Sequence, residues 1–170
     1  FMQRQYAADR MVVVAAGAVN HDDFVREVER HLGSFRATCD SKPAHAATYI
    51  GGDFREERDL QDAQIILGFE GRAYHVRDFY ASQILSMILG GGMSSRLFQE
   101  VRERRGLAYS VYSFASHHAD AGLVGVSVGC LPGKLDAVLA TVRDELARVA
   151  REGISAEELA RGQGQLRGGL

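Results

Sequence analysis

The chain has 170 residues, of which 46% are hydrophobic and 25% are charged, and its formal net charge is −2. This length and composition are typical of one globular domain, or of one domain with part of another. The small net charge excludes a general basic surface for nucleic acid or acidic membranes, so we expect neither as a partner. No apolar run approaches the roughly 18 residues of a membrane-spanning helix, and no signal segment opens the chain, which favours a bacterial cytoplasmic location.

Both ends of the chain are interpreted as truncation points. The sequence begins at Phe1 without an initiator methionine and ends at Leu170 within or just after a helical pattern. Its two cysteines, Cys39 and Cys130, are far apart and form no CxxC motif. Free thiols in a reducing compartment are favoured, and a disulfide between them is the alternative.

The first part of the chain predicts one strand and one helix. Residues 10–17 are rich in β-branched side chains and end at a glycine, which is typical of a buried strand. Asn20 then predicts a helix N-cap, and Gly33 predicts the end of that helix. From residue 36 to residue 58 no period is sustained. We therefore predict the end of one domain over residues 1–38, an interdomain linker over 39–58 and a second domain over 59–170.

The second domain predicts alternating strands and helices in the order β-α-α-β-β-α-α. This order indicates an α+β fold, truncated here, with helices layered on one face of a largely antiparallel sheet. The expected elements are a strand at 63–69, a helix at 75–89, a short helix from Ser94 or Ser95 to Gly106, strands at 107–116 and 122–130, a helix from Pro132 to Gly153 and a last helix opened by a Ser155–Glu158 capping box.

Three glycines, Gly90–Gly92, separate two of these helices. They suit a hinge that lets two helices pack closely. A phosphate-binding loop is disfavoured, because neither GxxxxGK[ST] nor GxGxxG is present.

Catalytic motifs are missing from the chain. The six histidines form no HxxH, HxxxH or HxxEH pattern, and His117 and His118 are adjacent, so on a strand they would point to opposite faces. No GxSxG motif is present. We therefore predict no catalytic residue and no metal ligand in this chain.

Arg102 and Tyr109 are the candidate binding residues. Arg102 lies in the last turn of the short helix, and Tyr109 lies in the strand that follows Gly106. Guanidinium and phenol groups are good donors to peptide carbonyl oxygens, and both side chains are predicted to converge near the helix-strand junction. The alternative is structural: Arg96, Arg104 and Arg105 would form a solvated basic face, and Tyr109 would be a core aromatic.

The segment from Leu89 to Gly129, LGGGMSSRLFQEVRERRGLAYSVYSFASHHADAGLVGVSVG, closely resembles the second-domain motif of short pitrilysin-like (M16) zinc metallopeptidases. Residues 6–33 resemble the closing strand and helix of the first domain of these enzymes, and residues 151–170 also match. The glycine loop is short, as in bacterial enzymes and the β-type subunits of the mitochondrial processing peptidase.

The resemblance implies a two-domain enzyme whose halves face each other across a chamber. Its first domain holds zinc through HxxEH and a distant glutamate, and its second domain contributes an arginine and a tyrosine seven residues apart that hold the substrate backbone. Arg102 and Tyr109 have this spacing, whereas HxxEH is absent from this chain. The resemblance therefore implies a full-length zinc metalloendopeptidase, and a chain that supplies a chamber wall and is inactive alone, without bound zinc.

Two other functions stay open. The parent protein is alternatively a catalytically silent M16-like subunit that binds peptides or an active partner, or a scaffold domain without a peptide site. Expected partners are a peptide or unfolded polypeptide, the missing N-terminal domain and a second subunit in a homodimer or heterodimer.

Overall fold

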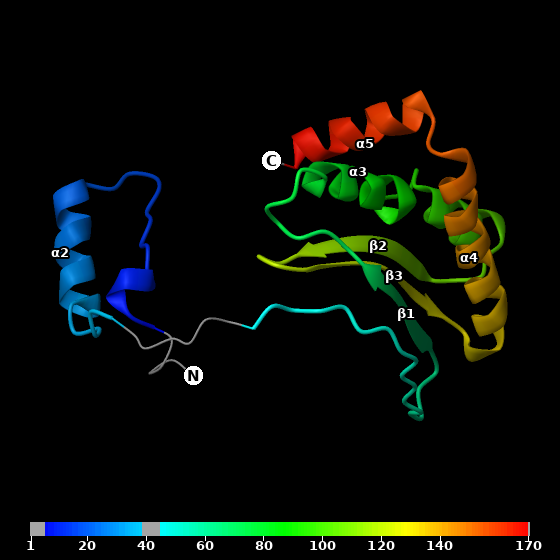
Figure 1. Cartoon of the computed structure of the whole chain (residues 1–170), viewed down its shortest axis with the longest axis horizontal. Helices are drawn as coiled ribbons and strands as arrows, with labels where there is room; N and C mark the ends of the chain where they lie inside the picture. The colour runs from blue at the N-terminus through cyan, green and yellow to red at the C-terminus, as the bar shows by residue number, and fades with distance from the viewer. Residues whose placement is uncertain (1–5, 39–44, 170) are drawn as a thin grey trace. The chain divides into compact units, whose positions relative to one another are not determined.

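The structure is a computed structural model that describes residues 6–38 and 45–169. The chain divides into two compact units, residues 1–45 and residues 46–170 (Figure 1). This division falls within the range predicted for the linker. Residues 39–44, with Cys39, lie outside the described residues, so the predicted domain assignment stays a prediction.

Within residues 6–38, the first unit contains one 3₁₀ turn, Ala8–Arg10, and one helix, α2 (His21–Leu32). The Asn20 side chain caps α2 as predicted, because its Oδ1 accepts hydrogen bonds from the backbone N–H groups of Asp22 at 3.0 Å and Asp23 at 3.2 Å. At the other end, the Gly33 N–H donates to the Glu29 carbonyl at 2.9 Å. The capping prediction is confirmed at both ends of the helix.

The prediction of a strand over residues 10–17 is wrong. Residues 11–16 form no regular element, and Val12 and Val14 are 90% and 81% exposed. A strand is stable only when a neighbour accepts and donates its backbone hydrogen bonds, and the described residues of the first unit include no strand to pair with it. The β-branched composition of this segment was therefore insufficient to predict a strand.

The second unit is built on a three-stranded antiparallel sheet of β1 (Ala63–Glu70), β2 (Ser110–His117) and β3 (Gly122–Cys130) in the order β1-β3-β2. Val128 of β3 is in register with Ile65 of β1 and Val111 of β2. Strand β3 has the predicted bounds, 122–130. Its first residue follows a tight loop of residues 118–121, in which the His118 N–H donates to the Ala121 carbonyl at 2.8 Å.

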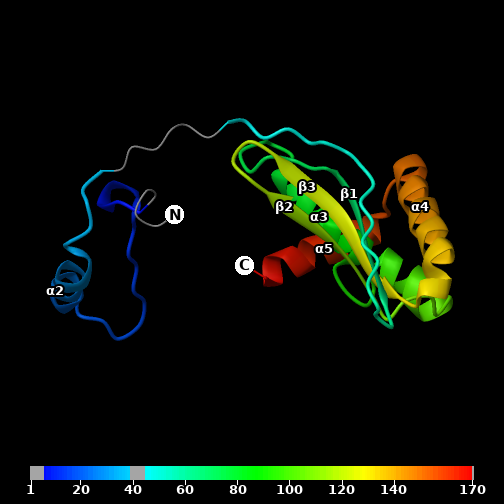
Figure 2. The same ribbon diagram turned by 90° about the horizontal axis from the view of Figure 1, so that it is seen from below.

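Three helices lie on one side or at one end of this sheet: α3 (Phe79–Gly90) packs on the sheet, α5 (Ala156–Gly168) packs on α3, and α4 (Leu135–Glu152) lies at one end (Figure 1). Figure 1 shows α3 above β2 and β3, α5 above α3, and α4 at one end of the sheet. Seen from below, the strands lie in front of α3 and α5 (Figure 2). The predicted α+β class, with helices on a largely antiparallel sheet, is confirmed. No helix among the described residues is both long and apolar enough to cross a bilayer.

The core lies between the sheet and the helices. Its buried members come from α3, the helical segment before β2, the strands β2 and β3, and α4: Leu89, Leu97, Val101, Val111, Val126, Val128, Cys130, Val138 and Val142. Cys130 is a free thiol that is fully buried, and this burial raises its pKa. A raised thiol pKa disfavours the reactive thiolate, so Cys130 is a packing residue.

Helix α3 begins at Phe79, four residues later than the prediction of His75. The preceding turn is tied to the β2–β3 loop, because the Tyr74 N–H donates to the His118 carbonyl at 2.8 Å. The Phe79 ring packs 4.9 Å from the Tyr74 ring and 4.5 Å from the His117 ring. These tertiary contacts hold the segment as a turn although its sequence continues the helical period.

Gly90 mediates a close approach, although not between the two helices that the sequence suggested. A Cβ atom on Gly90 would lie 2.8 Å from the Tyr112 carbonyl carbon and still closer to the Ser113 nitrogen. The Oγ atoms of Ser86 and Ser113 lie 3.2 Å apart at the same contact. Small residues thus bring α3 down onto the backbone of β2.

Candidate functional site

The two candidate binding residues flank a compact helix-to-strand turn. Arg102 lies in η2 (Phe98–Arg104), a π-helical segment, and Gly106 ends the helix with a φ of +56°. The Gly106 N–H donates to the Arg102 carbonyl at 3.1 Å, and the Leu107 N–H donates to the Val101 carbonyl at 2.8 Å. Gly106 is therefore the helix stop that the sequence predicted, in the left-handed conformation that glycine adopts without strain.

Strand β2 begins at Ser110, three residues later than the predicted start at Leu107. The Leu107 N–H is already bonded to the helix end, so it is not available for a strand partner. Tyr109 consequently lies just before β2, where its N–H donates to the Gly129 carbonyl of β3 at 2.9 Å. The backbone of Tyr109 is thereby fixed to the sheet.

Both candidate side chains are accessible to a ligand. The side chain of Arg102 is 46% exposed, its guanidinium carbon lies 4.8 Å from the centre of the Phe98 ring, and its Nε lies 4.0 Å from Glu103. Tyr109 is 55% exposed, and its hydroxyl has no hydrogen-bond partner among the described residues. No hydrogen bond joins Arg102 to Tyr109 within the described chain, and their convergence on one ligand stays a prediction.

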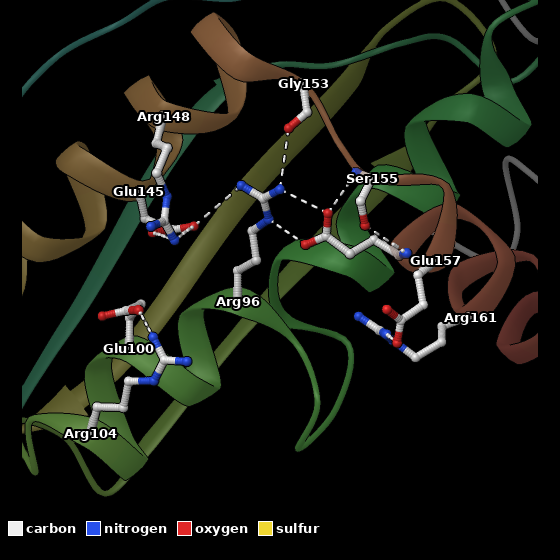
Figure 3. Close-up of polar contacts among 10 residues, drawn as sticks. Arg96, Glu100, Arg104, Glu145, Arg148, Gly153, Ser155, Glu157 and Arg161 are labelled. Atoms are coloured by element: carbon white, nitrogen blue, oxygen red, sulfur yellow. Dashed lines mark hydrogen bonds and ion pairs between the residues drawn. The ribbon is translucent and has the colours of Figure 1, made fainter.

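Arg96 differs from its neighbouring arginines. The structural alternative placed Arg96 on a solvated basic face with Arg104 and Arg105, but its side chain is only 16% exposed. Figure 3 shows its guanidinium between α4 and α5. Its Nε lies 2.5 Å from Glu158 Oε1, its Nη2 lies 2.8 Å from Glu158 Oε2, and its Nη1 lies 3.5 Å from Glu145.

The carboxylates around Arg96 are also fully engaged. Glu158 is 13% exposed and Glu145 only 6%. Glu158 completes the predicted capping box of α5, because its Oε2 accepts from the Ser155 N–H at 2.8 Å and its own N–H donates to Ser155 Oγ at 3.2 Å. Glu145 also pairs with Arg148 at 2.7 Å. Two buried arginine-carboxylate contacts thus compensate charges whose isolated burial would be costly.

The position of Arg96 could have been found only in part from the sequence. The capping box marks Glu158 as a fixed carboxylate at the start of α5, but nothing in the local pattern around Arg96 distinguishes it from Arg104 or Arg105. The separation of 62 residues between Arg96 and Glu158 is bridged only by tertiary structure.

The pKa of Glu158 is lowered from its usual 4.5 to about 2. The largest cause is the hydrogen bond from Arg96, and the hydrogen bond from the Ser155 backbone N–H contributes less. Because the folded state holds this carboxyl deprotonated more strongly than the unfolded state does, Glu158 stabilises the fold above about pH 4.5. This contribution is expected to disappear as the pH falls towards 2. Urea unfolding midpoints measured across this range, for the wild type and for Glu158→Gln, check the expectation.

Glu158→Gln cannot lose a proton, so it serves as the reference. The difference in unfolding midpoint between the wild type and this variant should be largest near neutral pH and should shrink below about pH 4. A difference that is the same at all pH values would contradict the role given to the Glu158 carboxylate.

Metal ligands do not gather in this structure. Among residues 6–38 and 45–169, no group of three or more His, Cys, Asp or Glu side chains is arranged to hold a metal ion. His117 instead lies at the end of β2, with its Nδ1 2.7 Å from the Arg72 carbonyl. The residues described do not fit a zinc centre.

Comparison with known proteins matches residues 1–166 to the family model for the peptidase M16 inactive domain. The chain belongs to the peptidase M16 family. The predicted resemblance is confirmed.

Bacterial relatives in this family are named zinc proteases. The chain is 43% identical to an uncharacterized zinc protease of Streptomyces coelicolor, over 99% of this chain and 38% of that protein. It is 43% identical to one from Mycobacterium tuberculosis and 34% identical to one from Bacillus subtilis, in both cases over its whole length and over 40% and 41% of theirs. The chain thus spans about two-fifths of the length of these curated relatives.

Solved structures share the fold. The M16 inactive domain from Pseudomonas fluorescens is 29% identical and aligns with a TM-score of 0.61 over 64% of this chain and 26% of that chain. A protease from Helicobacter pylori is 20% identical and aligns with a TM-score of 0.70 over 89% of this chain and 38% of that chain, which supports the fold alone.

Proposed function

We propose that this chain is part of a zinc metalloendopeptidase that hydrolyses peptides or unfolded polypeptides. The observation that carries the proposal is the match of nearly the whole chain to the M16 family, together with relatives that are named zinc proteases. The chain supplies one wall of the substrate chamber and lacks the zinc site, so it is inactive alone. The metal is held by another part of the parent protein, where it supplies Lewis-acid chemistry.

Within that enzyme, Arg102 and Tyr109 hold the substrate backbone. The exposed guanidinium offers a planar set of N–H donors, and the Tyr109 hydroxyl offers one O–H donor that no described residue occupies. The backbone of both residues is held by hydrogen bonds. The Gly106 N–H donates to the Arg102 carbonyl at the helix end, and the Tyr109 N–H donates to the Gly129 carbonyl at the start of the strand. Donors held in place before the substrate arrives stabilise carbonyl oxygens as these gain negative charge.

The test uses the full-length protein, with a pool of internally quenched peptides as the probe. Peptide hydrolysis is expected, it should be abolished by 1,10-phenanthroline, and added Zn²⁺ should restore it. The 170-residue chain alone is expected to be inactive at the same concentration. A zinc-loaded, folded full-length protein that cleaves none of the peptides would contradict the proposal.

That negative result would favour the second candidate, a catalytically silent M16 subunit that binds peptides or an active partner. The exposure of the Arg102–Tyr109 region is equally suited to binding without cleavage. Under this alternative the silent protein would bind the same peptides, which fluorescence anisotropy would detect, or it would form a heterodimer with an active subunit. A homodimer and a bacterial cytoplasmic location stay predictions for both candidates.

A further inference from the structure

The helical run of residues 96–104, which consists of η2 and the two helical residues before it, carries Arg102 and presents three different faces to its surroundings. Leu97 and Val101 are fully buried in the core. Phe98 and Arg102 stack on each other, four residues apart, with the Arg102 side chain partly exposed. The third face is formed by Arg96, whose side chain is largely buried against α4 and α5. The direction of Arg102 therefore depends on how the whole segment is rotated about its axis.

The apolar packing of this segment includes no directional bond. Leu97 and Val101 are aliphatic side chains, and aliphatic contacts are not directional. Arg96 adds direction, because its planar guanidinium makes parallel contacts of 2.5 and 2.8 Å with the two oxygens of Glu158. A two-point contact between a planar fork and a carboxylate is geometrically specific, whereas a single ion pair is not.

Arg96 also joins the ends of two helices. Its Nη2 donates to the carbonyl of Gly153 at 3.2 Å, just after the C-terminus of α4, and Glu158 lies in the first turn of α5. The C-terminal end of a helix favours a cation, and the N-terminal end favours an anion. The ion pair thus has each charge at the helix end that stabilises it. Figure 3 shows these contacts meeting at the Arg96 guanidinium.

We propose that Arg96 is a positioning residue for the peptide-binding site, which sets the rotation of the segment and hence the direction of Arg102. This inference rests on the proposed function. Arg96 does not touch the substrate: its own groups face Glu158, Glu145 and Gly153. Its effect on the reaction passes through Arg102, six residues further along the same helical segment.

The experiment measures kcat/KM of the full-length, zinc-loaded protein with the internally quenched peptide pool. Arg96→Met removes the fork and keeps most of the side-chain volume, and we expect a fall of about 10-fold or more, since a shift of about 1 Å can cost about 100-fold. Arg96→Lys keeps the charge without the two-point contact and should recover part of the loss. Circular dichroism and thermal unfolding select the folded variants.

Arg161→Met is the matched control. Arg161 lies on α5 and pairs with Glu157, but both side chains are exposed, at 46% and 83%, so this pair fixes no helix. Its kcat/KM should equal that of the wild type. A similar loss in Arg161→Met would show that any change on α5 lowers activity, and it would overturn the specific role of Arg96.

The decisive comparison is a double-mutant cycle with Arg102→Ala. If Arg96 acts through Arg102, Arg96→Met will cost little once Arg102 is absent. Equal losses with and without Arg102, or no loss in Arg96→Met, would overturn the positioning role alone. Unchanged activity in Arg102→Ala would overturn both this role and the proposed function of Arg102. If Arg96→Met does not fold, the cycle with Arg96→Lys gives the same distinction.

Discussion

Arg102→Ala is expected to lower kcat/KM for peptide hydrolysis by the full-length protein about 100-fold, and Tyr109→Phe should have an effect of the same order. The reason is the loss of a fixed donor to a carbonyl oxygen that gains charge, which typically costs about 10²–10³ in rate. Both side chains are about half exposed, so neither substitution leaves a cavity or an unpaired buried group. Stability should change by no more than about 0.5 kcal/mol.

The chain provides a matched control for each substitution. Arg104 is on the same helical segment, is 66% exposed and pairs with Glu100, so Arg104→Ala removes one positive charge at a neighbouring position. Tyr112 is 51% exposed on β2, so Tyr112→Phe removes one exposed hydroxyl. Both controls should hydrolyse peptides like the wild type. If all four variants behave alike, the binding role of Arg102 and Tyr109 is wrong.

Gly90→Ala is expected to destabilise the second unit by about 2–3 kcal/mol, the scale of an overpacked core. The added Cβ would meet the backbone of Tyr112 and Ser113, which belongs to a paired strand and cannot rotate away as a side chain can. The helix would have to rise from the sheet, which would weaken the contact between the Oγ atoms of Ser86 and Ser113. Urea unfolding followed by circular dichroism measures the loss.

Gly164→Ala is the control for the same chemical change. Gly164 lies in α5, and a Cβ atom there would meet nothing within 4 Å. Alanine favours a helix over glycine by about 1 kcal/mol, so this variant should be slightly more stable than the wild type. The two substitutions should therefore have opposite signs. An unfolding midpoint of Gly90→Ala at or above that of the wild type would contradict the close approach of α3 to β2.

Local signals in the sequence predicted the ends of several elements correctly. Asn20, Gly106 and the Ser155–Glu158 pair each act on backbone groups within a few residues, so the pattern that predicts them is complete in a short window. The strand 122–130 was predicted for the same reason, since its apolar run is bounded by a tight loop and by Pro132. The candidate residues Arg102 and Tyr109 were inferred from the resemblance of one motif to the second domain of M16 peptidases, and their binding role stays a prediction.

Predictions failed where an element depends on a distant partner. The β-branched run at 11–16 has no strand to pair with in the described part of the first unit, and the start of α3 is displaced by contacts with His118 and His117. Gly90 was recognised as permitting a close approach, but its partner is a strand and not a helix. In each case the missing information is a contact between residues far apart in the sequence.

The amino-acid sequence alone determined the family of this protein, its α+β class and most helix and strand boundaries, because these follow from short-range patterns and from a long motif. It also predicted two candidate binding residues, Arg102 and Tyr109. Only the tertiary structure decided that Arg96 is a buried link between two helices while Arg102 and Arg104 on the same segment are exposed. The physical reason is that burial and ion pairing depend on which surfaces meet. Glu145 and Glu158 contact Arg96 because α4 and α5 pack beside it in the folded unit.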